Sequence, residues 1–223
     1  MDLGLPSLPA MPGPEYRGPT PWSNWVIRPR LIAGAYPAGQ DDGETDRILT
    51  TLLELGVTTF VCLQAEFSLH TSENLWRTGQ EKLDFLHLPI LDGNVTTDTA
   101  MSRLVDDCCL RLLRGERLYV HCWGGHGRTG TVIATMLGRL YHLPVATALR
   151  YTQAFHDTRR YPQGVRSPQT PVQIAQRFQY LAAIPWSLDP GQIVETHILC
   201  PPPLRPRLRS RSLLCATWHR LVP

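Results

Sequence analysis

Lysine and long apolar runs are both scarce in this sequence of 223 residues. Lys82 is the only lysine, and arginine supplies the other basic residues. No apolar run reaches the roughly 18 residues that a membrane-spanning helix needs, so no transmembrane segment is expected. The net charge of +3 comes from the C-terminal end, where five arginines follow Thr196 without an acidic residue. The rest of the chain is slightly acidic, which argues against a nucleic-acid partner.

The sequence also lacks an export signal and regularly spaced cysteines. Asp2 stands where a signal peptide has basic residues, and several prolines interrupt the start of the chain. The six cysteines form neither a disulfide framework nor the paired spacing of a metal site; they are at positions 62, 108, 109, 122, 200 and 215. We therefore expect a cytoplasmic protein with reduced thiols and without a bound metal or cofactor.

Composition divides the chain into three parts. Residues 1–21 are rich in proline and glycine, which predicts a flexible arm. Residues 22–186 carry the periodic apolar patterns of a folded domain. Residues 187–223 become rich in proline and arginine, which predicts a disordered tail. Weak contact of this basic tail with anionic surfaces is an open alternative.

Strand and helix patterns alternate along the central part. Short β-branched or apolar runs predict strands at residues 25–27, 31–36, 57–63, 85–90 and 118–121. Helical spacing predicts helices at residues 44–55, 72–82, 97–114, 128–141, 144–158 and 170–183. This alternation predicts a single α/β domain with a central, largely parallel sheet flanked by helices.

The most informative segment runs from His121 to Gly130 and reads HCWGGHGRTG. It joins a predicted strand to a predicted helix, where backbone N–H groups and the helix dipole favour an anion. Its glycines permit the unusual φ angles that turn successive N–H groups inward as a nest. The residues expected to form this nest are Trp123, Gly124, Gly125, His126 and Gly127. Such surroundings bind phosphate and keep a thiol ionised at neutral pH.

Two side chains at the start of the helix complete this chemistry. Arg128 offers a planar fork that binds two phosphate oxygens at once, a geometry that lysine lacks. Thr129 places a hydroxyl near the sulfur of Cys122, where it would stabilise the thiolate as a leaving group. The alternative, a free cysteine beside a structural glycine turn, does not explain this combination of residues. The segment predicts a cysteine nucleophile with a phosphate clamp.

The segment resembles the HCx5R[ST]G signature of the cysteine-dependent protein tyrosine phosphatases, and the domain size is similar to the dual-specificity branch. The resemblance implies a two-step reaction without metal, through a cysteinyl-phosphate on Cys122. It also implies an acid on a loop about thirty residues before the cysteine, and Asp92 has that position. Asp92 as a plain turn residue is the alternative, and Asp98 is the next candidate for the acid.

The resemblance implies a role for a glutamine, and position in the loop or the sheet predicts roles for three further residues. Gln169 would position the hydrolytic water, with Gln173 as the alternative. His121 is expected to bond the loop backbone and support the cysteine, and His126 is expected to face the mouth of the pocket. Cys62 ends a strand on the same sheet edge as Cys122, so a reversible disulfide and plain packing both remain open.

Three functions follow from these residues. The first is a phosphatase acting on phosphotyrosine, and on phosphoserine or phosphothreonine, in proteins. The second is a phosphatase of phosphoinositides or inositol phosphates, whose known forms carry basic residues where this chain has Trp123 and His126. The third is a catalytically silent phosphate-binding module, which the presence of Cys122, Arg128 and Asp92 disfavours.

Overall fold

The computed structural model describes residues 4–66, 83–161 and 164–181. In these residues a short 3-10 turn, Pro14–Tyr16, precedes five strands and five α-helices. The strands are β1 Ser23–Ile27, β2 Leu31–Gly34, β3 Thr59–Gln64, β4 Asp84–Ile90 and β5 Leu118–His121. The helices are α1 Asp42–Glu54, α3 Asp98–Leu113, α4 Gly127–Tyr141, α5 Val145–His156 and α6 Pro171–Leu181.

The strands form one sheet in the order β1-β2-β5-β3-β4. Only β1 is antiparallel to its neighbour; β2, β5, β3 and β4 are parallel to one another. The carboxyl ends of four parallel strands therefore lie along one edge of the sheet, perpendicular to the strands, and β5 is the central strand. The connections that follow these strands meet along that edge, which is where α/β proteins bind ligands.

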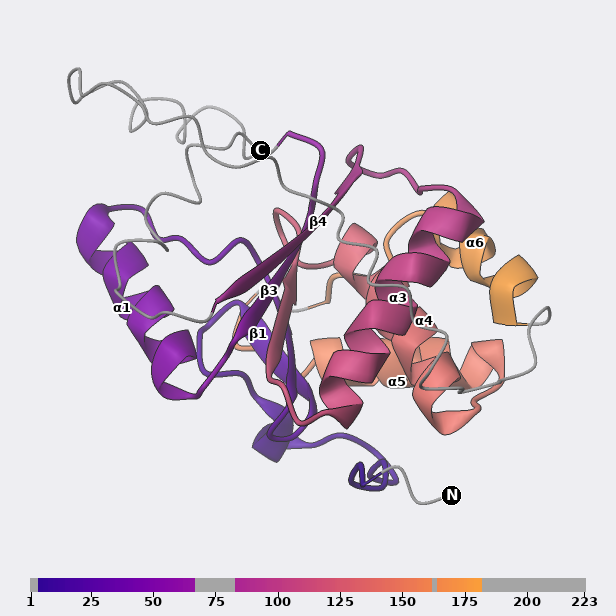
Figure 1. The fold of residues 1–223 in the computed structure, drawn as a ribbon, viewed down its shortest axis with the longest axis horizontal. Helices are drawn as coiled ribbons and strands as arrows, with labels where there is room; N and C mark the ends of the chain where they lie inside the picture. Colours follow the sequence, from indigo (N-terminus) through magenta and orange to yellow (C-terminus); the bar gives the residue numbers. More distant parts are fainter. Residues whose placement is uncertain (1–3, 67–82, 162–163, 182–223) are drawn as a thin grey trace.

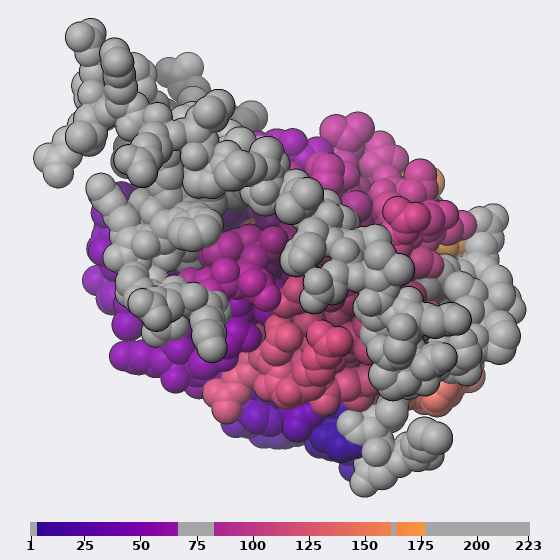
Figure 2. All heavy atoms as spheres, viewed as in Figure 1, coloured from indigo at the N-terminus to yellow at the C-terminus, as the bar shows by residue number. Residues whose placement is uncertain are grey.

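Alternate residues of the central strands build two cores. Val61 and Val120 face α3, α4 and α5 in the larger core. Phe60 and Tyr119, the next residues back on the same strands, face α1 in a smaller core. The period of two follows from the pleat of a strand. Figure 1 shows α1 on one side of the sheet and α3 to α6 on the other. In the space-filling view from the same direction, α1 is purple and lies at the left edge of the molecule (Figure 2).

The predicted α/β class with a largely parallel sheet is confirmed, and most element boundaries differ by one or two residues. The strand at residues 118–121 is as predicted, and the helix after it begins at Gly127. The strand predicted for residues 31–36 stops at Gly34, because the amide of Tyr36 turns away to the carbonyl of Trp123. The predicted helix at 72–82 and the predicted tail at 187–223, with its domain boundary at 186, lie outside the described residues.

Residues 4–21, for which the composition predicts a flexible arm, contact the rest of the domain in the structure. Leu5, Leu8 and Tyr16 pack against the larger core, and two tyrosines of α4 and α5 hold the backbone. The hydroxyl of Tyr141 donates to the carbonyl of Pro6, and that of Tyr151 to the carbonyl of Pro9, each at 2.9 Å. A proline has no N–H to donate to a neighbouring strand, but its carbonyl still accepts hydrogen bonds.

Candidate active site

The segment from Cys122 to His126 is a tight loop between β5 and α4. Cys122 is buried, and it follows directly on the last residue of β5. Gly125 has a φ of +75°, and a Cβ there would lie 2.3 Å from the carbonyl oxygen of Gly34. No other residue type fits this position, for both conformational and steric reasons. The loop therefore lies directly against the end of β2.

The other two glycines of the loop differ from the expectation that each adopts an unusual φ. Within this loop, which the structure describes in full, only Gly125 has a positive φ, and Gly124 and Gly127 do not. Gly124 is constrained sterically instead, because a Cβ there would lie 2.6 Å from Cδ2 of His126. The carbonyl of Gly124 accepts a long hydrogen bond of 3.5 Å from Nη1 of Arg159. The loop therefore has a single left-handed residue, Gly125. Phosphate binding by Gly124 stays a prediction.

The first turn of α4 offers its backbone N–H groups to an anion. No side chain caps this end of the helix: His126 is the N-cap residue, and its ring makes no capping hydrogen bond. The uncapped N–H groups and the helix dipole favour a negative charge beside Cys122. This arrangement is the one that the strand-loop-helix pattern predicts for a phosphate-binding loop.

Arg128 is buried, with 1% of its side chain exposed, and three oxygens from two residues fix its guanidinium. Both carboxylate oxygens of Glu66 accept hydrogen bonds from it, each at 2.9 Å, and the carbonyl of Ile90 accepts a third at 2.9 Å. The Nε atom has no hydrogen-bond partner among the described residues. An N–H donor aimed by a fixed guanidinium is what a phosphate oxygen requires.

The electrostatics of this pair follow from its hydrogen bonds. Burial by itself would raise the pKa of Glu66, but the hydrogen bonds and charge of Arg128 outweigh it and lower that pKa. Burial would likewise lower the pKa of Arg128, and Glu66 reverses the direction. Both groups are therefore charged at neutral pH, and Arg128 remains a cation although its side chain is almost fully buried.

Asp92 lies beside the same guanidinium, at the Nη2 atom that also bonds Glu66. Its Oδ1 is 3.0 Å from Nη2 of Arg128, while 81% of its side chain is exposed. The turn that carries it is closed by the amide of Asn94 donating to Leu91, with Gly93 at a φ of +70°. The hydroxyl of Thr170 donates to the carbonyl of Gly93 at 2.9 Å. The structure thus brings Asp92, Arg128 and the cysteine loop together.

The two candidate glutamines occupy different positions. The side chain of Gln173 is buried; its oxygen accepts from the amides of Gln169 and Thr170, and its nitrogen donates to Asn94. A Cβ at Gly127 would come within 2.6 Å of that oxygen. Gln169 is exposed on the loop before α6. Gln173 therefore ties this loop to the Asp92 turn, and Gln169 as the residue that positions water stays a prediction.

The histidines of the loop lie deeper than their positions in sequence suggest. The ring of His121 packs against Tyr36 and Tyr119, with centroid distances of 5.7 and 5.8 Å, and burial lowers its pKa to about 4. His126 turns its Nδ1 to Nε2 of His156 on α5, at 2.8 Å, instead of presenting the whole ring to the pocket mouth. Burial and the charge of Arg159 lower the pKa of His126 to about 4. Both rings are thus neutral at pH 7.

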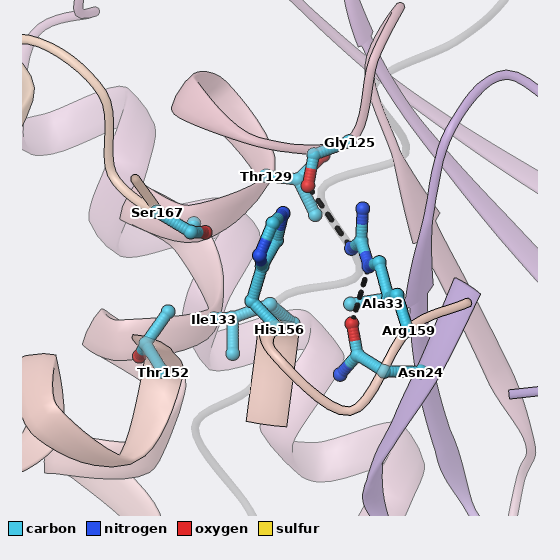
Figure 3. Close-up of a pocket in the computed structure, with 10 residues that line it drawn as sticks. Asn24, Ala33, Gly125, Thr129, Ile133, Thr152, His156, Arg159 and Ser167 are labelled. Carbon is cyan, nitrogen blue, oxygen red and sulfur yellow. Dashed lines mark hydrogen bonds between the residues drawn. The ribbon is translucent and has the colours of Figure 1, made fainter. Parts of the chain in front are cut away.

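A second buried arginine supports the loop from behind (Figure 3). Nη2 of Arg159 donates to the carbonyl of Gly125 at 3.1 Å, and its Nε donates to Asn24 at 2.7 Å. The hydroxyl of Ser167 donates to the carbonyl of His126 at 2.9 Å. A small cavity behind the loop is lined by Asn24, Arg159 and Ser167, together with Ala33, Gly125, Thr129, Gly130, Ile133, Thr152 and His156.

Thr129 and Cys62 complete the set of predicted residues. Thr129 is buried on the first turn of α4, and its hydroxyl has no hydrogen-bond partner among the described residues. Cys62 is a free, buried thiol opposite His121 in the β3–β5 register. Burial raises the pKa of Cys62 to about 12, so this thiol is protonated at neutral pH.

Sequence reasoning missed Glu66, Arg159 and His156. Glu66 lies in the turn after β3, and its role depends on a partner 62 positions away. Arg159 is one of two adjacent arginines, and only the fold buries it. A signal was present for Glu66, because an acidic residue that follows a parallel strand lies on the ligand-binding edge of the sheet.

Two further properties concern the described residues as a whole. They contain no cluster of three or more histidine, cysteine, aspartate or glutamate side chains with the spacing of a metal site. Among the helices that they form, none is both long and apolar enough to cross a bilayer.

The chain matches two viral proteins. "Putative tyrosine phosphatase 067L" of Invertebrate iridescent virus 3 is 29% identical over 145 residues, which are 61% of this chain and 54% of the viral protein. "Putative tyrosine phosphatase 197R" of Invertebrate iridescent virus 6 is 26% identical over 146 residues, 64% of this chain and 51% of that protein. The chain therefore spans about half the length of these curated relatives.

Solved structures share its fold. Tk-PTP in its active form superposes with a TM-score of 0.58 at 21% identity and covers 74% of this chain and 99% of its own. Human DUSP28 superposes with a TM-score of 0.54 at 16% identity, over 74% of this chain and 96% of its own. A family model described as "Swiss Army Knife protein, DSP-PTPase phosphatase domain" (PTP-SAK) matches residues 20–170. The matched residues include every strand of the described part of the chain and the cysteine loop, and the chain belongs to this family of tyrosine and dual-specificity phosphatase domains.

Proposed function

We propose that this chain is a phosphatase that hydrolyses phosphate monoesters through a cysteinyl-phosphate, acting on phosphotyrosine and also on phosphoserine or phosphothreonine in proteins. The observation that carries the proposal is the position of Arg128. Its guanidinium is fixed by Glu66 and Ile90 and lies 3.0 Å from Asp92. Arg128 itself lies in the first turn of α4, the helix that follows the cysteine loop. The proposed clamp and the proposed acid are thus in contact, beside the loop that carries the proposed nucleophile.

In the first step, Sγ of the Cys122 thiolate attacks phosphorus while the bond from phosphorus to the ester oxygen breaks. The electron pair of that bond goes to the ester oxygen, which takes a proton from the carboxylic acid of Asp92. The loop N–H groups and Arg128 hold the other phosphate oxygens, whose charge they stabilise as the transition state forms. The exposed position of Asp92 allows it to reach a leaving group at the mouth of the site.

In the second step, water attacks the phosphorus of the cysteinyl-phosphate. Asp92, now a carboxylate, accepts a proton from that water, and the bond between phosphorus and sulfur breaks to release phosphate and the thiolate. The hydroxyl of Thr129 would stabilise the departing sulfur, and Gln169 would position the water. The loop that carries Gln169 is bonded to the Asp92 turn through Thr170 and Gln173, which keeps these groups in one assembly.

The charge of the loop favours protein monophosphates over phosphoinositides. In the segment from Cys122 to Gly130, Arg128 is the only side chain that is a cation at neutral pH, because Trp123 is apolar and the pKa of His126 is lowered to about 4 by burial and by Arg159. Arg159 itself is already bonded to Asn24 and to the carbonyl of Gly125. An inositol ring with several phosphates would need further cations close by. A silent phosphate-binding module would not need an acid beside Arg128.

The test compares three substrates with the full chain in the presence of EDTA: a phosphotyrosine peptide, the same peptide with phosphoserine, and an inositol polyphosphate. We expect turnover of the peptides, and Cys122→Ser should lower it at least about a thousandfold while phosphate binding persists. Cys62→Ala is the matched control, because it removes another buried thiol at the same edge of the sheet. Activity of Cys122→Ser within tenfold of wild type, or a requirement for metal, would contradict the proposal.

A further inference from the structure

Arg159 is a buried cation whose hydrogen bonds all go to uncharged oxygens. It is 3% exposed; its Nε donates to the side chain of Asn24 at 2.7 Å, and its Nη2 to the carbonyl of Gly125 at 3.1 Å (Figure 3). Its Nη1 makes a longer bond of 3.5 Å to the carbonyl of Gly124. None of the ion pairs formed by the described residues includes Arg159. Burying a charge is costly without an opposite charge, so this position calls for an anion nearby.

The groups that interact electrostatically with Arg159 identify that anion. Burial lowers the pKa of Arg159 to about 10, and the two groups that oppose the shift are Tyr119 and Cys122. Tyr119 stays neutral, because burial raises the pKa of its phenol and its hydroxyl donates to the carbonyl of Ala35 at 2.7 Å. Cys122 begins the loop whose carbonyls Arg159 bonds. The anion that Arg159 can balance is therefore the thiolate of Cys122, or a phosphate bound to the same loop.

The other buried arginine of the site already has carboxylate partners. Both oxygens of Glu66 bond the terminal nitrogens of Arg128, each at 2.9 Å, and Oδ1 of Asp92 lies 3.0 Å from one of them. One positive charge thus faces two carboxyl groups, which leaves little of it for a thiolate and a phosphate. Arg159 has its whole charge available, and its buried position keeps water from screening that charge.

The other titratable side chains around the loop are uncharged at neutral pH. Burial, and after it the charge of Arg159, lower the pKa of His126 to about 4 and that of His156 to about 3. Burial lowers the pKa of His121 to about 4 and raises that of Cys62 to about 12. These four side chains therefore neither supply nor cancel charge behind the loop, where Arg159 lies.

We propose that Arg159 is the counter-charge of the cysteine loop, and that its positive charge, in addition to its hydrogen bonds, keeps Cys122 ionised and favours phosphate in front of it. The inference rests on the proposed function and adds a residue to its machinery. Arg159 is a positioning residue in this reaction, because it acts on the nucleophile from behind and takes no part in making or breaking bonds.

Asn24→Asp tests the charge while the arginine stays in place. Aspartate has the shape of asparagine and keeps an oxygen for Nε of Arg159, but its carboxylate offsets the positive charge. The measurement is the rate at which iodoacetamide alkylates Cys122 between pH 5 and 9, followed on the Cys122 peptide by mass spectrometry because the chain has six cysteines. Only the thiolate reacts, so the midpoint of this profile should rise by about half a pH unit or more. Inhibition by inorganic phosphate should weaken about threefold or more.

Asn24→Ala is the matched control, because it removes the same hydrogen bond to Arg159 without adding a charge. Its midpoint should lie within about 0.2 pH units of wild type. If Arg159 acted through hydrogen bonds alone, the alanine variant would shift the midpoint and the aspartate variant, which keeps an acceptor, would not. That outcome, or an unchanged midpoint in Asn24→Asp, would overturn the inference.

A second pair of variants changes the arginine itself. Arg159→Gln removes the charge, whereas Arg159→Lys keeps it but has a single nitrogen in place of the fork. We expect the glutamine variant to raise the midpoint by about one pH unit and the lysine variant to restore most of the wild-type value. Arg160→Gln, at an exposed arginine beside the ring of Tyr161, is the control and should change neither midpoint nor phosphate inhibition.

Equal midpoints for Arg159→Lys and Arg159→Gln would contradict a role for the charge. Should Arg159→Gln fail to fold, the two Asn24 variants still decide, because both keep Arg159. Absence of turnover in the wild type would refute the proposed function, and alkylation of Cys122, which needs no turnover, would still test Arg159.

Discussion

Both oxygens of Glu66 face the two terminal nitrogens of Arg128, each pair at 2.9 Å, although the residues are 62 positions apart in sequence. A carboxylate and a guanidinium that meet in this way are fixed in one plane. The orientation of the proposed phosphate clamp therefore depends on the turn after β3, which is separate in sequence from the cysteine loop.

Replacing Glu66 tests this dependence. Glu66→Gln keeps the shape but turns an amide N–H₂ toward the guanidinium, so Arg128 loses one acceptor and its alignment. We expect kcat to fall about tenfold or more and inorganic phosphate to inhibit more weakly. Glu116→Gln is the control, because Glu116 pairs with Arg111 at 3.1 Å in another ion-pair network. Unchanged phosphate inhibition in Glu66→Gln would show that the loop and helix orient Arg128 without help.

The geometry of Arg128 is tested by a lysine. Arg128→Lys keeps the charge but has one nitrogen in place of the fork, so it cannot bond Glu66, Ile90 and phosphate together. We expect the rate to fall about a hundredfold or more, measured as kcat/KM on an aryl phosphate. Arg139→Lys, at an ion pair with Asp106 on another face, is the control. A near-normal rate for Arg128→Lys would mean that phosphate binds elsewhere.

The role of Asp92 as acid predicts a dependence on the leaving group. Asp92→Asn should slow hydrolysis of phenyl phosphate about a hundredfold, but should slow esters of acidic phenols much less, because those leaving groups hardly need a proton. Single-turnover rates across a series of phenols, with Asp98→Asn as the control, would measure this. If the two variants depended equally on leaving-group pKa, the acid would not be Asp92.

The pair of His126 and His156 predicts a loss of stability in acid. Burial, with the charges of Arg159 and of the partner ring, lowers the pKa of His156 to about 3, and that of His126 is about 4. The unfolded chain takes up these protons near pH 6.5, so it binds more protons than the folded protein below that pH. Stability should therefore fall as pH decreases from about 6.5 toward 4.

Removing one ring should flatten that dependence. His156→Gln cannot take up a proton, so its free energy of unfolding should vary with pH less steeply, by up to about 1.4 kcal/mol per pH unit. Urea unfolding at several pH values between 7 and 4 would measure the slope, and His126→Gln should change it in the same direction. A slope equal to that of wild type in both variants would show that the pair does not govern acid stability.

The fold and the cysteine loop were predictable because their signals are local. A strand shows in alternating residues, a helix in residues three or four apart, and the loop in ten contiguous positions from His121 to Gly130. Gly56, which follows α1 with a φ of +75°, is a local signal of the same kind. Local chemistry places Cys122 and Arg128 in the site without reference to distant residues.

The contacts between distant segments were not predictable in this way. The folding of residues 4–21 onto α4 and α5 depends on Tyr141 and Tyr151, which a scan of composition does not connect with prolines more than 130 positions earlier. The turn of His126 toward His156 likewise depends on where α5 packs.

The sequence by itself determined the α/β class and the strand-loop-helix segment with Cys122 and Arg128, the proposed nucleophile and clamp, because each is encoded within a few consecutive residues. Only the tertiary structure decided that Glu66 orients Arg128, that Arg159 supports Gly125 from behind, and that Tyr36 stacks on Trp123. The physical reason is that parallel strands bring turns from distant parts of the chain to one sheet edge. Which side chains meet there depends on strand order and register, and no local pattern records either.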